Sequence, residues 1–259
     1  PAMNGYQYRV TVAGACTPAV TSTIVTLTVN SLPAISSHPN NATLCEGSNA
    51  IFNVSATGSG LTYQWQENTG SGYADIPGAT ASLFIKTSVT PAFNGYLYRV
   101  VVSGACPPSV TSNAALLTVN SLPAITTHPS SVTTCSGANV IFSTTATGSG
   151  LTYQWQEDTG SGFNNISGAT SASYTKTGIT GAMDGYQYRV IVSGTCSPAV
   201  TSNIAVLTVT TAPTITDQPD DVSICSGANA VFSVTTTGSG VAYQWQVNTG
   251  TGFSNISNN

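Results

Sequence analysis

The stretch Gly58-Ser-Gly-Leu-Thr-Tyr-Gln-Trp-Gln66 is present twice without a change, the second time at residues 148–156. Trp65 and Trp155, the tryptophans of the two copies, are 90 residues apart, and Trp245 follows 90 residues later. The cysteines keep the same period in two series, which are Cys16, Cys106 and Cys196, and Cys45, Cys135 and Cys225. Since an internal period of this kind arises when one structural unit is duplicated, we expect neighbouring units to share one fold.

Short linkers that end in proline separate the repeats. They occupy residues 30–33, 120–123 and 210–213. Polar, proline-containing linkers are typical of domain boundaries. We therefore expect complete domains at residues 33–120 and 123–210, the C-terminal half of a repeat at residues 1–30, and the N-terminal part of a further repeat at residues 213–259.

Residue types and their alternation both indicate β-structure. Of the 259 residues only 5 are basic and 9 acidic, whereas helical proteins use many more Glu, Lys and Arg. In residues 96–102, Tyr98 and Val100 alternate with residues such as Arg99, which is the period of a half-buried strand. Six or seven short runs of this kind, broken by Gly, Pro, Ser and Asn, fit into one repeat. The sequence thus predicts an all-β fold of tandem sandwich domains.

The charge of the chain argues against two classes of partner. The formal net charge is −4, and the five basic residues form no stripe that could neutralise phosphates or anionic lipid. The longest apolar stretches, such as residues 114–117, are far shorter than the roughly 20 residues that span a bilayer. We expect no nucleic acid partner and no membrane insertion in this segment.

Two motifs of each repeat have counterparts in a known kind of domain. Trp65, in Tyr-Gln-Trp-Gln, is similar to the strand C tryptophan that packs between two sheets, and Tyr96, in Asn94-Gly-Tyr-Leu-Tyr98, is similar to the corner tyrosine of strand F. The repeats resemble the immunoglobulin-like repeats of large bacterial secreted or cell-surface adhesins, of the gliding-associated and type IX-secreted type. This resemblance implies tandem immunoglobulin-like β-sandwich domains in an elongated array, an extracellular or cell-surface location, strands F and G in residues 1–30, and core positions for Trp65, Trp155, Trp245, Tyr6, Tyr96 and Tyr186.

The cysteines depart from the pattern of that family, because its two core cysteine positions hold Val54 and Tyr98 here. We expect all six cysteines to lie in loops and to form disulfides, which favours an oxidising compartment. One pairing joins Cys45 to Cys106 within a repeat, although the length of strand F separates their loops by far more than the ~7 Å limit between Cα atoms. The other is head to tail and joins Cys45 to Cys196 of the next repeat. Both pairings stay open at this point.

The sequence offers little for catalysis or cofactor binding. His38 and His128 both stand before proline at equivalent positions, where an ordinary edge-strand role explains them better than general base catalysis. The cysteines lack the close pairs of a zinc site. Asp217, Asp220 and Asp221 offer fewer oxygen ligands than calcium normally takes. We therefore expect no enzyme, no catalytic residue, no cofactor and no metal site.

Two functions fit these observations. The first is structural: a repeat segment of an extracellular stalk, adhesin shaft or filament, whose partners are neighbouring repeats of the same polypeptide or fibre. The alternative is an adhesion module that binds a host or surface glycan or protein through its loops. Alternation assigns the Trp residues to the core, and Tyr73, Phe163 and Phe253 are expected to point inward. Because no aromatic platform for sugars is left over, the structural role is the primary prediction.

Overall fold

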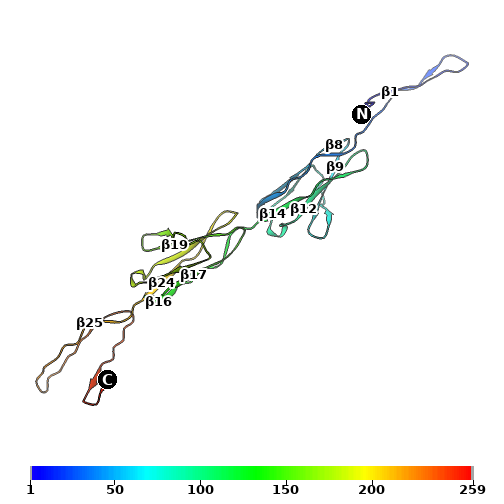
Figure 1. The fold of residues 1–259 in the computed structure, drawn as a ribbon. Helices are drawn as coiled ribbons and strands as arrows, with labels where there is room; N and C mark the ends of the chain where they lie inside the picture. The colour runs from blue at the N-terminus through cyan, green and yellow to red at the C-terminus, as the bar shows by residue number, and fades with distance from the viewer. Residues whose placement is uncertain (1, 258–259) are drawn as a thin grey trace. The chain divides into compact units, whose positions relative to one another are not determined.

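The computed structural model describes residues 2–257 and has two compact units, with the boundary between Leu122 and Pro123. Each unit contains one complete β-sandwich and one shorter terminal segment (Figure 1). Apart from two single turns of 3-10 helix, the regular elements of residues 2–257 are β-strands. The prediction of an all-β fold is confirmed.

The first sandwich consists of two facing sheets. Its elements are β5 (Ala34–Ser37), β6 (Ala42–Cys45), β7 (Ala50–Asn53), β8 (Ser55–Thr57), β9 (Thr62–Asn68), β10 (Tyr73–Asp75), β11 (Leu83–Lys86), η1 (Pro91–Phe93), β12 (Leu97–Ser103), β13 (Val110–Thr111) and β14 (Ala115–Asn120). One sheet has the order β10-β9-β12-β14-β6, with β13 paired to β12, and the other side is formed by the pairs β11-β7 and β5-β8.

The chain crosses from one sheet to the other between β5 and β6. β5 pairs antiparallel with β8, whereas β6 pairs parallel with β14, from Ala42 opposite Leu117 to Cys45 opposite Asn120. His38 lies in the crossing segment, and its Nδ1 accepts a hydrogen bond from the backbone N–H of Asn113 at 3.1 Å. The first segment of the domain therefore contributes one strand, β5 or β6, to each sheet. Each of these strands covers an edge of its sheet.

The core lies between the sheets and follows the alternation of β12. Tyr98, Val100 and Val102 are fully buried, and the residues between them are only partly buried. Trp65 in β9 has an exposed fraction of 0%, and its Nε1–H donates a hydrogen bond to the Ala81 carbonyl at 2.9 Å. A large ring whose one polar group is satisfied stabilises a core strongly. Trp65 therefore fixes β9 against the loop that precedes β11.

The second sandwich repeats the first in element order and pairing register. Its elements are β15 (Ala124–Thr127), β16 (Val132–Cys135), β17 (Val140–Ser143), β18 (Thr145–Thr147), β19 (Thr152–Asp158), β20 (Phe163–Asn165), β21 (Ser173–Lys176), η2 (Gly181–Met183), β22 (Gln187–Ser193), β23 (Val200–Thr201) and β24 (Ala205–Thr210). Its larger sheet has the order β16-β24-β22-β19-β20, with β23 paired to β22. Trp155, Tyr188, Val190 and Val192 are fully buried between its sheets.

The two terminal segments form only two-stranded sheets. Their strands are β1 (Gln7–Tyr8), β2 (Thr11–Val12), β3 (Val20–Thr21) and β4 (Val25–Thr26) in the N-terminal segment, and β25 (Thr214–Asp217), β26 (Thr235–Thr237), β27 (Gln246–Asn248) and β28 (Phe253–Asn255) in the C-terminal one. They pair as β1-β4, β2-β3, β25-β26 and β27-β28. Pairs of two strands do not enclose a core, and most large apolar side chains of both segments are exposed.

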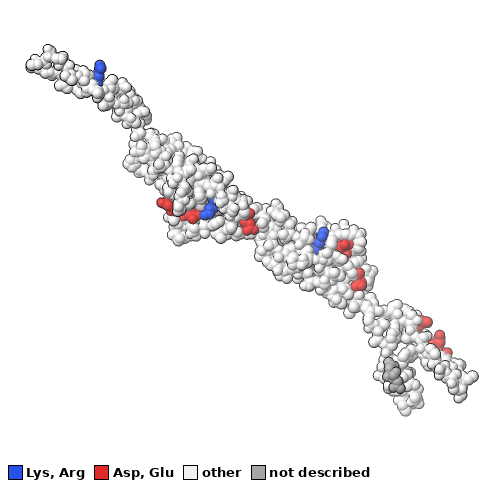
Figure 2. All heavy atoms as spheres, turned by 180° about the vertical axis from the view of Figure 1, so that it is seen from behind, with Lys and Arg blue, Asp and Glu red and all other residues white. Residues whose placement is uncertain are grey.

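The surface carries few charges. Figure 2 shows that the few basic side chains in view are surrounded mainly by uncharged residues and form no basic patch on any one part. In residues 2–257 we find no helix with the length and apolar character needed to cross a bilayer.

Candidate functional site

The two cysteines of a repeat lie at opposite ends of its sandwich. Cys45 ends β6 beside Asn120, where the chain leaves the domain, and the neighbouring Glu46 accepts a hydrogen bond from the Leu122 backbone N–H at 2.9 Å. Cys106 lies where the chain enters, because its Sγ contacts the Asn30 carbonyl oxygen at 3.8 Å. β12 runs between these ends and has seven residues, which is about 23 Å of strand. A disulfide within one repeat is therefore out of reach.

The cysteines are in two chemical states. Cys45 and Cys196 are disulfide-bonded. The free thiols are Cys16, Cys106, Cys135 and Cys225. This differs from the expectation that all six form disulfides, and the pairing of Cys45 with Cys106 is not formed. The physical reason is the separation of the two cysteines along the sandwich.

The expected core aromatic residues have different environments in complete and incomplete repeats. Trp65 and Trp155 are fully buried, whereas Trp245 is 38% exposed and Tyr6 is 52% exposed. Tyr96 and Tyr186 are partly buried and pack against the cores of their repeats, and the Tyr96 ring meets the Phe93 ring edge-on at 5.6 Å. Burial of the central ring thus depends on strands that only a complete repeat supplies.

Tyr98 and Tyr188 occupy the strand F positions at which immunoglobulin domains carry a cysteine. Each ring stacks on a phenylalanine of the facing sheet, with centroids 4.7 Å apart for Phe52 and Tyr98 and 4.4 Å apart for Phe142 and Tyr188. Both hydroxyls are buried and make no hydrogen bond of good geometry with any residue in the described range. Aromatic stacking therefore fills the core at these strand F positions.

Burial raises the pKa of Tyr98 well above its usual value of 10.0, and the nearby Glu67 carboxylate raises it further. The unfolded chain therefore loses this proton at a lower pH than the folded repeat does. The stabilising contribution is complete below pH 10 and falls as the pH rises above 10. We expect Tyr98→Phe to weaken the loss of stability between pH 8 and pH 11, measured as the shift in urea midpoint. An identical shift in the wild type and the variant would contradict the burial of an ionisable hydroxyl.

A polar and aromatic group recurs on the outer face of the β10-β9-β12 sheet. The Arg99 guanidinium lies 3.7 Å from the centre of the Tyr73 ring, and Arg99 Nε–H donates to Gln66 Oε1 at 2.8 Å. Gln66 Nε2–H in turn donates to Asp75 Oδ1 at 2.8 Å. We call Arg99, Gln66 and Tyr73 the Arg–Gln–aromatic stack. Tyr73 packs on this arginine and does not point inward as expected.

The second repeat contains the same stack. Arg189 lies 3.9 Å from the centre of the Phe163 ring and donates through Nε–H to Gln156 Oε1 at 2.7 Å. In the C-terminal segment Gln246 and Phe253 take the equivalent positions, but Phe253 is 73% exposed. The stack there lacks its arginine.

The two histidines are held by backbone hydrogen bonds. His38 and His128 each use Nδ1 to accept a backbone hydrogen bond at 3.1 Å, from Asn113 and Asn203. No group of three or more His, Cys, Asp or Glu residues within residues 2–257 is arranged to hold a metal ion. The histidines thus have a structural role at the sheet crossing.

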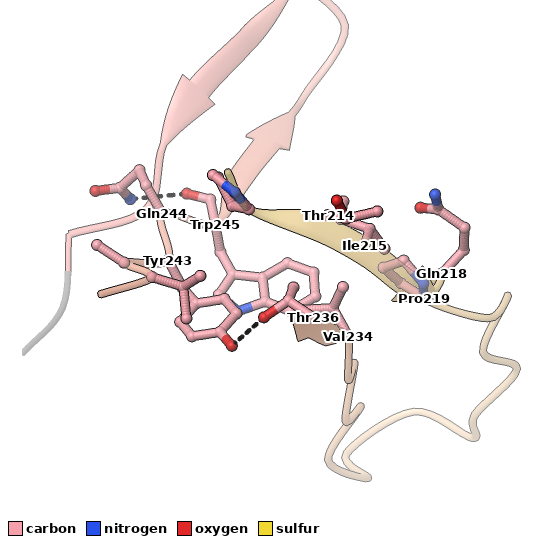
Figure 3. Close-up of a pocket in the computed structure, with 12 residues that line it drawn as sticks. Thr214, Ile215, Gln218, Pro219, Val234, Thr236, Tyr243, Gln244 and Trp245 are labelled. Carbon is pink, nitrogen blue, oxygen red and sulfur yellow. Dashed lines mark hydrogen bonds between the residues drawn. The ribbon is translucent and has the colours of Figure 1, made fainter. Parts of the chain in front are cut away.

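A groove of about 500 Å³ lies in the C-terminal segment (Figure 3). Ile215, Val234, Tyr243 and Trp245 contribute its apolar wall, and the Tyr243 hydroxyl is hydrogen-bonded to Thr236 Oγ1 at 2.6 Å. The equivalent residues of the second repeat, which include Ile125, Tyr153 and Trp155, pack against Val190 and Val192 of β22. The groove is thus the place that strand F fills in a complete repeat.

Residues 35–121 and 124–211 each match one family model, described as "Domain of unknown function (DUF8696)". The two matches together cover more than half of the chain. The chain belongs to this family. Each DUF8696 domain corresponds to one of the two sandwiches, with its cysteines at opposite ends and one Arg–Gln–aromatic stack.

One curated relative matches about two thirds of the chain. Endoglucanase C of Cellulomonas fimi is 30% identical over 177 residues, which are 67% of this chain and 16% of the relative. The chain thus spans less than a fifth of the length of that protein.

Solved structures similar to this chain contain consecutive Ig domains. A structure of three titin Ig domains has a TM-score of 0.62 at 15% identity and covers 88% of this chain and 82% of its own. DIP-gamma IG1+IG2 has a TM-score of 0.52 at 16% identity, with 68% and 97% covered. At this identity the likeness shows the fold alone. The prediction of tandem immunoglobulin-like β-sandwiches is confirmed.

Proposed function

We propose that this chain is a structural segment of an extracellular stalk, adhesin shaft or filament of a bacterial protein. Its partners in this role are the neighbouring repeats of the same polypeptide or fibre. The tandem immunoglobulin-like fold, the short proline-containing linkers and the low charge support the proposal. A binding module would need a distinctive surface on its loops, and the recurrent aromatic side chains are engaged in cores or in Arg–Gln–aromatic stacks.

The observation that carries this proposal is the placement of the cysteines. Cys45 lies at the exit end of its sandwich and cannot reach Cys106, yet it is oxidised, as is Cys196. The Ser149 carbonyl binds the Thr195 backbone N–H at 2.8 Å, as the Ser59 carbonyl binds that of Ala105, so Cys196 belongs to the entry end of its own repeat. We therefore propose the head-to-tail pairing of Cys45 with Cys196. A covalent link from the exit of one repeat to the entry of the next restricts bending, which is what a shaft requires.

Peptide mapping tests this pairing directly. Trypsin cleaves after Arg9, Lys86, Arg99, Lys176 and Arg189, and so separates the cysteines into peptides 10–86, 100–176 and 190–259. After alkylation of free thiols and digestion without reductant, we expect 10–86 joined to 190–259. Mass spectrometry that finds 10–86 joined to 100–176 instead would show pairing within a repeat.

Two cysteine variants test whether the proposed disulfide restricts bending between the repeats. Cys45 is disulfide-bonded, and its equivalent in the second repeat, Cys135, is a free thiol. We expect Cys45→Ser to broaden the distribution of distances between fluorophores on the two sandwiches. Cys135→Ser should leave this distribution unchanged. Equal distributions for wild type and Cys45→Ser in single-molecule energy transfer would contradict the stiffening role.

We also propose that these repeats are not themselves catalytic. His38 and His128 are each engaged as hydrogen-bond acceptors by backbone N–H groups, which leaves them poorly suited to take a proton from a substrate. The similarity to Endoglucanase C covers 16% of that protein and does not by itself carry its activity to this chain. Hydrolysis of a cellulose substrate by the purified chain would overturn this part of the proposal.

A further inference from the structure

The Arg–Gln–aromatic stacks hold two guanidinium groups in fixed positions on the outer faces of their sheets. The Arg99 guanidinium lies 3.7 Å from the centre of the Tyr73 ring, and its Nε–H donates to Gln66 Oε1 at 2.8 Å. Arg189 has the same contacts in the second repeat, at 3.9 and 2.7 Å. A guanidinium that is already held by a ring and a hydrogen bond loses less conformational entropy when it binds a ligand.

Neither guanidinium has an acidic partner within residues 2–257. The ion pairs in this range are Lys86–Glu67 and Lys176–Glu157. In Arg99 and Arg189, Nε is the only nitrogen with a hydrogen bond to a residue that the structure describes. Both arginines are partly exposed, so their Nη1 and Nη2 donors are available to a ligand. The planar donor set of a guanidinium matches the two oxygens of a carboxylate.

An acceptor oxygen belongs to the hydrogen-bonded group of each stack. Gln66 Nε2–H donates to Asp75 Oδ1 in the first repeat, and Gln156 Nε2–H donates to Asn165 Oδ1 in the second, both at 2.8 Å. Asp75 and Asn165 are exposed, and a carboxylate or amide oxygen that accepts one hydrogen bond can accept another. The negative charge of Asp75 disfavours an anion that has no hydroxyl to donate. The site therefore favours a ligand that carries both a carboxylate and a hydroxyl.

We propose that each Arg–Gln–aromatic stack binds a uronic acid, the acidic sugar of anionic polysaccharides. The arginine binds the carboxylate of the sugar, and Asp75 or Asn165 accepts a hydrogen bond from one of its hydroxyls. An acidic protein side chain offers a carboxylate without a hydroxyl and uses only half of the site. This inference goes beyond the structural role proposed above, and it does not depend on the disulfide pairing.

NMR titration of the isotope-labelled 259-residue chain with trigalacturonic acid tests the inference. The Nε–H signals of Arg99 and Arg189 report on the two sites, because each group lies at its site and is hydrogen-bonded. Since an exposed ion pair contributes little by itself, we expect both signals to shift with a dissociation constant of about 1 mM. The methyl-esterified sugar, which has no charge, should bind at least about tenfold more weakly.

Arg99→Lys and Arg189→Lys form a matched pair of variants. Lysine keeps the positive charge but lacks the planar set of donors. Arg99→Lys should weaken binding to the first repeat at least about tenfold, followed through the side-chain amide of Gln66, and leave the shift of the Arg189 signal unchanged. Arg189→Lys should have the reverse effect. The unaltered repeat is in each case the control for folding and for general effects of charge.

Asn165→Ala tests the hydroxyl contact without a change of charge. The residue is exposed, so the fold of the second repeat should be retained. We expect this variant to weaken binding of trigalacturonic acid to the second repeat by about fivefold. Binding to the first repeat should not change. Equal affinity of the second repeat in the variant and the wild type would contradict the hydroxyl contact.

Triglutamate distinguishes the sugar from an acidic peptide, because it carries carboxylates without hydroxyls. We expect it to bind at least about tenfold more weakly than trigalacturonic acid. Four results would each overturn the inference. They are arginine signals that do not shift at sugar concentrations up to about 20 mM, equal binding of the acid and its methyl ester, triglutamate that binds as tightly as the sugar, and binding to the first repeat that Arg99→Lys leaves intact.

Discussion

Replacing Trp155 with alanine is expected to destabilise the second repeat by about 3–5 kcal/mol, out of a domain stability of about 5–15 kcal/mol. The ring is fully buried, and its centre lies 6.4 Å from that of Phe142 and 6.2 Å from that of Tyr174. Its Nε1–H donates to the Ser171 carbonyl at 2.9 Å, so the substitution leaves both a cavity and an unpaired carbonyl. Calorimetry, with hydrogen exchange to assign each transition to a repeat, measures the loss.

Trp245→Ala is the matched control for this substitution. The residue has the same place in the repeat and a similar ring contact, with Phe232 at 6.4 Å, but it is 38% exposed. We expect this variant to lower neither main transition. If Trp155→Ala left the transition of the second repeat unchanged, the role of the tryptophan between the two sheets would be wrong.

Gly58→Ala is expected to have the second large effect, on the first repeat. Gly58 has a φ of +147°, and a Cβ there would lie 2.9 Å from Pro33 Cα and 3.0 Å from the Leu32 carbonyl oxygen. The backbone strain costs about 1–3 kcal/mol, and overpacking against the linker costs about 1–3 kcal/mol more. The denaturant midpoint of the first repeat should therefore fall. The two atoms contacted belong to the linker backbone, which cannot move aside as a flexible side chain can.

Gly47→Ala is the control variant, because it introduces backbone strain without a steric contact. Gly47 also has a positive φ, +81°, but a Cβ there would meet no atom within 4 Å. We expect a loss of about 1 kcal/mol for this variant. Equal losses for the two variants would mean that the close approach of the linker at Gly58 contributes nothing to stability.

The sequence predicted the elements that depend on local pattern. The period-2 alternation in residues 96–102 identified the buried side chains of β12, and the repeated tryptophan identified the centre of β9. It placed Tyr73 incorrectly, because β10 has only three residues and alternation in so short a strand does not define a face. The stack of Arg99 on Tyr73 requires β12 and β10 to flank β9, which is a property of the sheet order.

The cysteines show a limit of prediction from local sequence pattern. The sequence by itself determined the repeat length and the all-β class, and it predicted the burial of Trp65 and Trp155, because these follow from side-chain periodicity along the chain. The length of strand F already indicated that Cys45 and Cys106 lie far apart, but only the tertiary structure decided that Cys45 and Cys196 are oxidised and that Tyr73 stacks on Arg99. These features depend on which strands lie side by side, and residues distant in sequence determine that arrangement through burial and pairing.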